Sequence, residues 1–143
     1  MRLEAICHNE DETAALGARL ARELEPGDAA LLSGEMGAGK SVFARGLARA
    51  LGVTEAMPSP TFMLMLPHRA SGGLWVYHLD LFRLDGARAF RESGLEEAFS
   101  GVALIEWPER CAGAFGAAKR LFNARIEYGE ADTERRVVIE REE

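Results

Sequence analysis

The sequence predicts an α/β fold, in which a mixed β-sheet is flanked by helices and extended by antiparallel hairpins. Residues 34–41 fit the pattern G-x-x-x-x-G-K-[ST] at every fixed position. A short apolar run at 29–32 precedes this loop, and residues 42–51, which follow it, carry apolar side chains at helical spacing. Strand, glycine-rich loop and helix in this order are the context in which the pattern binds phosphate, so we expect a fold like that of P-loop NTPases.

The segment before the loop predicts a strand and a helix. Residues 3–7 alternate weakly between apolar and polar side chains, which favours an edge strand. Asn9 and Glu12 have the spacing of a capping box, which predicts a helix over residues 10–24. Pro26-Gly27 then ends the helix and turns the chain into the strand at 29–32.

The middle of the chain predicts a helix and then a β-hairpin. Gly52 follows the helical pattern of residues 42–51 and is expected to be its C-cap. The apolar segments 62–66 and 74–79 favour two strands, and Ser71-Gly72-Gly73 supplies the turn between them. An antiparallel hairpin here would leave the sheet mixed.

The second half of the chain predicts one buried strand, two short helices and a second hairpin. Residues 102–105 are a continuous apolar run, which is typical of a buried strand. A short helix is expected near 87–91, and another from Pro108 to about residue 112. Segments 121–128 and 135–141 alternate with period two around a turn at 129–133. We expect this hairpin to extend the sheet and attach no chemistry to it.

Composition limits the classes of protein to consider. A chain of 143 residues is expected to form a single domain, residues 1–143. The net charge of −6 argues against a broad electrostatic grip on nucleic acid. No apolar run approaches the roughly 20 residues that cross a bilayer, so no membrane association is expected. Cys7 and Cys111 lack the spacing of a metal site and are interpreted as reduced thiols of a cytoplasmic protein.

The glycine-rich loop predicts a site for a nucleoside triphosphate. Glycines let consecutive backbone amides approach the phosphate oxygens, and the start of the helix adds partial positive charge. The Lys40 ammonium would contact the β- and γ-phosphates, and the Ser41 hydroxyl would be a ligand of Mg²⁺. The predicted nucleotide-binding residues here are Glu35, Met36, Gly37, Ala38, Gly39, Lys40, Ser41 and Val42.

Two acidic residues stand at the ends of predicted strands. Asp80 follows 74–79, and Glu106 follows 102–105. In an open α/β sheet, ligands bind at the edge formed by the carboxyl ends of the strands. We therefore predict Lys40, Asp80 and Glu106 as catalytic residues, and Ser41, Glu106 and Asp80 as the metal site. Ser41 and Glu106 are the first choice for the metal, and Asp80 would order the attacking water or support the metal.

Four sequence blocks together resemble the TsaE family, the bacterial ATPases of tRNA threonylcarbamoyladenosine biosynthesis. The blocks are residues 34–41, Ser59-Pro60-Thr61-Phe62, the stretch HLDLFRL at 78–84, and Glu106-Trp107-Pro108-Glu109. The resemblance covers about residues 9–110. Val42 stands where the family commonly has threonine, and Phe82 where it has tyrosine. Neither change removes a required charge.

The resemblance implies ATP and Mg²⁺ as cofactors and the TsaB and TsaD proteins as partners. The family's role is to hydrolyse ATP and so drive or reset the TsaB–TsaD assembly, which gives only an indirect link to tRNA. Thr61 lies in a segment that resembles a nucleotide-sensing switch, where it would respond to the γ-phosphate. For the adenine base we choose Thr13, near the start of the first predicted helix.

Two other functions are compatible with the loop. A small-molecule kinase would need a lid of cationic side chains, for which Arg83, Arg88 and Arg91 are candidates, although such a set is also typical of a solvated helix face. A nucleotide-dependent scaffold would bind ATP and change its affinity for partners without needing hydrolysis. His8, His68 and His78 share no spacing that would favour a metal hydrolase.

Overall fold

The protein is described here from a computed structural model that covers residues 1–60 and 63–142. Thr61 and Phe62, which belong to the predicted switch segment, lie outside these residues. The elements in chain order are β1 (Arg2–Cys7), α1 (Glu10–Ala21), β2 (Ala29–Ser33), α2 (Lys40–Leu51), β3 (Met65–Arg69), β4 (Trp75–Asp80), α3 (Ala87–Glu92), the 3₁₀ helix η1 (Leu95–Ser100), β5 (Val102–Glu106), the 3₁₀ helix η2 (Pro108–Cys111), β6 (Leu121–Tyr128) and β7 (Arg135–Arg141).

The strands form one mixed sheet in the order β1-β7-β6-β2-β5-β4-β3. Its centre is parallel, because β2 pairs in parallel with both β5 and β6, and β5 pairs in parallel with β4. The hairpins β3–β4 and β6–β7 and the edge pair β1–β7 are antiparallel. Both predicted hairpins and the predicted edge strand are confirmed. Strand β2, which leads into the phosphate loop (residues 34–41), therefore lies inside the sheet and is paired on both sides.

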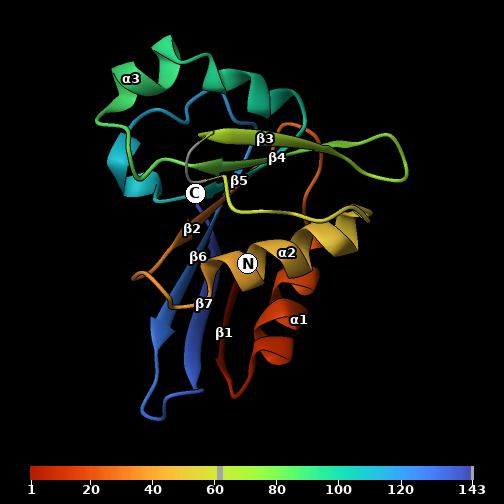
Figure 1. The fold of residues 1–143 in the computed structure, drawn as a ribbon, viewed down its shortest axis with the longest axis vertical. Helices are drawn as coiled ribbons and strands as arrows, with labels where there is room; N and C mark the ends of the chain where they lie inside the picture. The colour runs from red at the N-terminus through yellow and green to blue at the C-terminus, as the bar shows by residue number, and fades with distance from the viewer. Residues whose placement is uncertain (61–62, 143) are drawn as a thin grey trace.

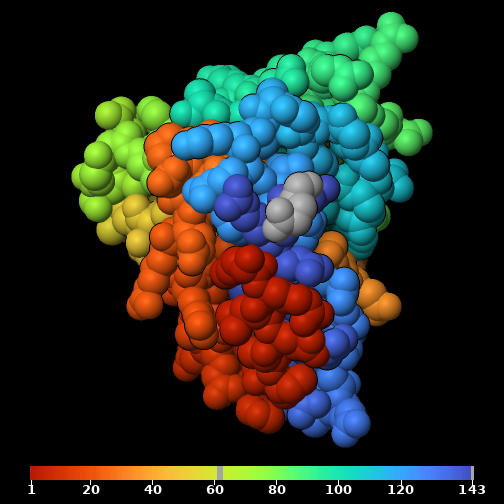
Figure 2. Space-filling model, turned by 180° about the vertical axis from the view of Figure 1, so that it is seen from behind, coloured from red at the N-terminus to blue at the C-terminus, as the bar shows by residue number. Residues whose placement is uncertain are grey.

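A hydrophobic cluster lies on each face of the sheet, one between the sheet and α1 and α2 and the other between the sheet and α3 and η1. Figure 1 shows these helices beside the sheet. On one face Leu20 of α1 and Phe43 and Leu47 of α2 pack against Leu32 of β2 and its neighbours. On the other face Phe90 of α3 and the residues of η1 pack against the alternate side chains of the same strands. Strand β1 and the C-terminal hairpin lie side by side in the lower half of the view from behind (Figure 2).

The helices α1 and α2 approach each other closely at two glycines. A Cβ on Gly17 of α1 would collide with the carbonyl oxygen of Phe43, and a Cβ on Gly46 of α2 would collide with the carbonyl oxygen of Ala14. Each helix therefore uses a glycine to admit the backbone of the other. This contact fixes the position of α2, whose first turn carries Lys40 and Ser41.

Two predicted boundaries are wrong. The first helix ends at Ala21 and not at residue 24, because the amides of Arg22, Glu23 and Leu24 bond to carbonyls three residues back and tighten the chain into a turn. The strand predicted at 62–66 begins instead at Met65. Leu64 has φ 62°, and the amides of Met63 and Leu64 bond to the carbonyl of Pro60, so this apolar segment opens with a turn.

The predicted helix caps and the predicted free thiols agree with the structure. The Asn9 side chain accepts a hydrogen bond from the Glu12 amide at 2.9 Å, and Gly52 caps α2 with φ 105°. The Glu12 carboxylate accepts a hydrogen bond at 2.7 Å from the amide of His8, the residue before the N-cap. Cys7 and Cys111 are buried free thiols, and burial raises the pKa of both. In the part of the chain that the structure describes, no helix has the length and apolarity that crossing a bilayer requires.

Candidate functional site

The phosphate loop connects β2 to α2 through three glycines with positive φ. Gly34, Gly37 and Gly39 have φ 148°, 80° and 114°. A Cβ on Gly34 would also collide with the carbonyl oxygen of Ile126 in β6. The first amides of α2 have no carbonyl partners within the helix, so they are available to an anion at its N-terminus. The loop thus has the backbone form that a phosphate cradle requires.

Lys40, in the first turn of α2, contacts its own loop. Its ammonium donates hydrogen bonds to the carbonyl oxygens of Gly34 and Glu35, the latter at 3.2 Å. It also lies 3.9 Å from the centre of the Trp107 ring. Burial lowers the pKa of Lys40, while the carboxylates of Glu106, Glu109 and Asp80 act in the opposite direction. A bound triphosphate would supply the negative charge that favours the ammonium form.

Asp80 and Glu106 are neighbours across the sheet. They are register partners at the carboxyl ends of β4 and β5, and they are 5% and 4% exposed. An Asp80 carboxylate oxygen accepts a hydrogen bond from the amide of Phe82 at 2.9 Å. Glu106 Oε2 lies 2.6 Å from Nε2 of His78. The two acids are therefore brought together on one face of the sheet.

The acids share a hollow of about 460 Å³ with the loop and the start of α2. Eight of the predicted site residues line it, namely Met36, Gly37, Gly39, Lys40, Ser41, Val42, Asp80 and Glu106. Glu10, Ser59 and Trp107 complete the wall. Trp107 has φ 58°, and its ring packs at a tilt of 57° against that of Phe82, with 5.0 Å between the ring centroids. The Trp107 ring thus forms a wall of the hollow beside the Lys40 ammonium.

The donor set of this hollow fits Mg²⁺. Among the described residues, no three His, Cys, Asp or Glu side chains gather closely enough to hold a metal by themselves. Two hydroxyls and three carboxylates line the hollow beside the phosphate loop, from Ser41, Ser59, Glu10, Asp80 and Glu106. Mg²⁺ is commonly held by one or two carboxylates together with substrate phosphates and waters, so it does not need a complete cage of protein ligands.

A second hollow, of about 520 Å³, lies on the other side of the loop. Thr13 lines it together with Gly37, Ala38, Gly39 and Val42, as do Asn9, Glu10 and Asp11 of the α1 start. The Thr13 hydroxyl donates to the carbonyl of Asn9 at 3.4 Å, and the residue is buried. Glu10, Gly37, Gly39 and Val42 line both hollows, so the second hollow adjoins the predicted phosphate site.

The C-terminal hairpin, to which the sequence analysis attached no chemistry, contacts the loop directly. The Tyr128 hydroxyl donates to the carbonyl of Met36 at 2.8 Å, and Arg135 Nε donates to the carbonyl of Ala38 at 3.0 Å. Asp132, Thr133 and Arg135 also line the second hollow. These residues escaped prediction because they are about a hundred positions from the loop and carry no motif.

His78, which contacts the Glu106 side chain, is another residue that the sequence analysis did not assign to the site. A signal for it exists, since it stands two residues before Asp80 on a predicted strand and must share that residue's face. Thr61 lies outside the described residues, so its predicted role is untested. Of the proposed lid residues, Arg88 and Arg91 are on α3, which packs on the face of the sheet opposite α2, and Arg88 pairs with Glu92.

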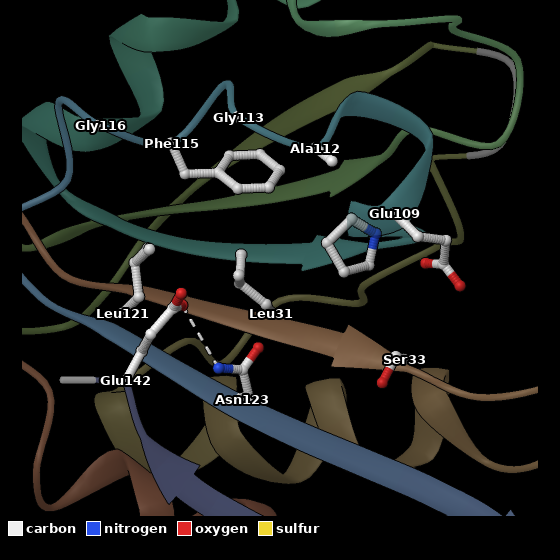
Figure 3. A pocket seen from close by; sticks show the side chains of 11 residues that line it. Leu31, Ser33, Glu109, Ala112, Gly113, Phe115, Gly116, Leu121, Asn123 and Glu142 are labelled. Carbon is white, nitrogen blue, oxygen red and sulfur yellow. Dashed lines mark hydrogen bonds between the residues drawn. The ribbon is translucent and has the colours of Figure 1, made fainter.

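A third hollow, of about 540 Å³, is apolar and lies on that opposite face (Figure 3). Figure 3 shows the Phe115 ring on one side of the space and Leu31 and Leu121 on the other, with Asn123 bonded to Glu142 at 3.4 Å. None of the predicted site residues that the structure describes lines this hollow. Among the described residues, its lining has no lysine or arginine beside a glycine-rich loop, whereas the hollow around Lys40 has both features that a triphosphate would need.

Comparison with known proteins identifies close relatives. The family model described as "Threonylcarbamoyl adenosine biosynthesis protein TsaE" matches residues 7–138. The curated protein from Treponema pallidum (strain Nichols) that is named tRNA threonylcarbamoyladenosine biosynthesis protein TsaE is 38% identical over 112 residues, which are 77% of this chain and 82% of the relative. The protein of the same name from Bacillus subtilis (strain 168) is 39% identical over 101 residues, 69% of this chain and 62% of the relative.

A solved structure agrees with the sequence comparisons. The crystal structure of Bacillus subtilis YdiB superposes with a TM-score of 0.77 at 29% identity. The match covers 97% of this chain and 84% of the YdiB chain. The similarity therefore includes the C-terminal hairpin as well as the region that carries the four sequence blocks.

Proposed function

Because the chain belongs to the TsaE family, we propose that it binds Mg²⁺-ATP at the phosphate loop and hydrolyses it in the service of TsaB and TsaD proteins. Its role in tRNA threonylcarbamoyladenosine biosynthesis follows from the family. The hydrolysis, the cofactors and the two partners are the parts that we propose. A cytoplasmic location is part of the proposal and is supported by the two buried free thiols.

One observation carries the proposal. Asp80 and Glu106, buried register partners at two parallel strand ends, line the same hollow as Lys40 and Ser41 at the start of α2. Buried carboxylates are costly unless they are paired or hold a cation. Their place beside a phosphate loop is the arrangement that phosphoryl transfer with a bound metal requires.

The residues of the hollow divide the work. The backbone amides at Gly37, Ala38 and Gly39 and the Lys40 ammonium would bind the β- and γ-phosphates. For this, Lys40 would leave the carbonyls of Gly34 and Glu35, and the Ala38 amide would leave the carbonyl of Glu35. Ser41 and Glu106 would hold Mg²⁺, with Asp80 ordering the attacking water or supporting the metal. Mg²⁺, when bound, supplies positive charge that neutralises the phosphate oxygens.

The nucleoside would extend from the loop toward the second hollow. Thr13, Val42 and the hairpin residues Asp132 and Thr133 line that hollow beside the loop glycines. We propose that the adenine base lies there. The assignment of Thr13 rests on this proximity. Thr61, which lies outside the described residues, keeps its predicted role of responding to the γ-phosphate.

The decisive experiment compares the two lysines of the chain. Lys40→Ala should abolish ATP binding in titration calorimetry, because it removes the cation at the phosphates. Lys119→Ala is the matched control, since Lys119 is exposed and forms an ion pair with Glu25 at 3.2 Å. Undiminished ATP binding by Lys40→Ala would contradict the phosphate assignment.

Hydrolysis and partnership need a second experiment. Phosphate release should be measured with wild-type protein, Glu106→Ala and Asp80→Ala, each with and without TsaB and TsaD. We expect ATP binding to persist in both variants and hydrolysis to be lost. Association with TsaB and TsaD should be recovered in at least one nucleotide state. A protein that binds ATP and both partners but never releases phosphate would instead be a nucleotide-dependent scaffold.

A further inference from the structure

His78 is a buried imidazole whose position is explained neither by the phosphate loop nor by the metal ligands. It is 1% exposed and lies in β4. Its Nε2 is 2.6 Å from Glu106 Oε2, and both side chains are buried. Its Nδ1 is buried and has no hydrogen-bond partner among the described residues. Among the described residues, the hydrogen-bond partner of this ring is therefore the Glu106 carboxylate.

The register of the sheet creates this contact. His78 pairs with Leu104 of β5, and Glu106 follows two residues later on the same strand. Side chains two residues apart on a strand share a face, so His78, Asp80 and Glu106 all point to the α2 face of the sheet. His78 thus lies behind Glu106, farther from the carboxyl ends of the strands, and does not line the hollow itself.

We propose that His78 is a positioning residue for ATP hydrolysis, which holds Glu106 Oε2 by an Nε2–H hydrogen bond and so directs the other carboxylate oxygen into the hollow. The inference rests on the proposed function. The proton is assigned to Nε2 because an ionised carboxylate only accepts hydrogen bonds. Hydrogen bonds to ligating carboxylates are a common means of fixing the ligand's orientation.

The alternatives available to Glu106 explain why orientation matters. The Lys40 ammonium and the Asp80 carboxylate line the same hollow. A Glu106 side chain without its imidazole partner would turn toward Lys40 to satisfy its charge. This would take the carboxylate from the metal and compete with the γ-phosphate for the same cation.

The test replaces the hydrogen-bond donor while keeping the volume of the side chain. His78→Met removes the donor, His78→Gln restores an amide donor near the place of Nε2, and His78→Asn offers a shorter amide that reaches only the place of Nδ1. Partner-stimulated kcat should be about 10- to 100-fold lower in His78→Met and His78→Asn, and largely recovered in His78→Gln. The Kd for a non-hydrolysable ATP analogue without Mg²⁺ should stay unchanged, and the Mg²⁺ concentration for half-maximal rate should rise.

His68 supplies the matched control. It is the other buried histidine on the α2 face, and its Nδ1 lies 2.7 Å from Glu55 Oε1. His68→Met therefore removes an imidazole–carboxylate pair away from the acids of the hollow, in which the imidazole is buried but Glu55 is exposed. We expect a smaller loss of thermal stability in His68→Met than in His78→Met, and no shift in Mg²⁺ requirement.

The outcomes are distinguishable. A wild-type protein that never releases phosphate would contradict the proposed function itself. With an active wild type, normal kcat and Mg²⁺ requirement in His78→Met would overturn the positioning role, as would equal effects in His78→Met and His68→Met. If His78→Met does not fold, equal activity of His78→Gln and His78→Asn would overturn it in the same way.

Discussion

Lys40 is held in a specific place by its own loop and by Trp107. Its ammonium bonds to two carbonyls of its own loop and lies against the Trp107 ring. A desolvated ammonium is stabilised by these contacts, and a phosphate must replace them. Nucleotide binding is therefore expected to change the surroundings of Trp107.

Tryptophan fluorescence measures this change. The chain has two tryptophans, and Trp75 stands at the far end of β4 from the acids. In Trp75→Phe protein, ATP should still alter the emission, because departure of the ammonium changes the electrostatic field at the Trp107 indole. In Trp107→Phe protein the signal should vanish. If ATP changed the emission of Trp107→Phe as much as that of wild-type protein, the signal would not come from Trp107 and the prediction would be contradicted.

At the scale of elements, the pair α1–α2 determines where the phosphate-binding helix starts. The reciprocal contacts at Gly17 and Gly46 involve backbone atoms, which cannot rotate away as a side chain can. The sequence shows these glycines inside helical patterns, where they lower helix propensity. Their conformational cost is offset by the close approach of the two helices.

Gly46→Ala should destabilise the protein by about 1–3 kcal/mol, because the added methyl group overpacks the interface. It should also weaken nucleotide binding, since a displaced α2 carries Lys40 and Ser41 with it. Thermal unfolding and calorimetry would measure the two effects. Gly72→Ala is the control, because nothing lies within 4 Å of a Cβ at that position. Equal stability of the two variants would contradict the packing argument.

The C-terminal hairpin is an element with a role that only its contacts reveal. The Arg135 guanidinium donates hydrogen bonds to the carbonyl of Ala38 in the loop and to the carbonyls of Asp132 and Glu134 in the hairpin. It also lies 4.6 Å from the centre of the Tyr128 ring. The residue therefore ties the hairpin turn to the phosphate loop.

Arg135→Met should weaken ATP binding about fivefold, which corresponds to roughly 1 kcal/mol for one hydrogen bond to the loop. Titration calorimetry with the analogue would measure it. The neighbouring Arg136→Met is the control, because Arg136 pairs with Glu4 at the open face of the sheet and does not line either hollow beside the loop. Equal affinities would contradict a role of the hairpin in nucleotide binding.

At the scale of the whole molecule, the negative net charge favours a protein over a nucleic acid as the direct binding partner. The net charge is −6, and the arginines on the open face of β1, β7 and β6 are paired with glutamates. Those ion pairs are Arg2 with Glu4 and Glu140, Arg125 with Glu127, and Arg136 with Glu4 and Glu127. Paired arginines release few counterions on meeting a phosphate backbone.

The isolated protein should therefore bind tRNA more weakly than about 10⁻⁴ M at physiological salt, the weak end of non-specific binding. Fluorescence anisotropy with labelled tRNA would measure this affinity at several salt concentrations. The TsaB–TsaD assembly, tested in the same assay with and without this protein, provides the comparison. Micromolar binding by the isolated chain with a steep salt dependence would contradict the expectation.

An element could be predicted well where the interactions that form it lie within a few residues along the chain. Caps, turns and alternating segments placed the two hairpins and the helix at the loop, because each signal acts within a few residues. The end of α1 and the start of β3 were missed, because a turn can pack an apolar residue against the core as well as a helix or strand can, as it does for the buried Leu24 and the partly buried Leu64.

The sequence alone determined the phosphate loop and the carboxylates at two strand ends, because both follow from fixed spacings along the chain. The tertiary structure decided that Asp80 and Glu106 are adjacent, that His78 lies behind Glu106, and that Arg135 reaches the loop. These contacts depend on strand order and register. Pairing between distant strands is selected by the packing of both faces of the sheet, which no local pattern encodes.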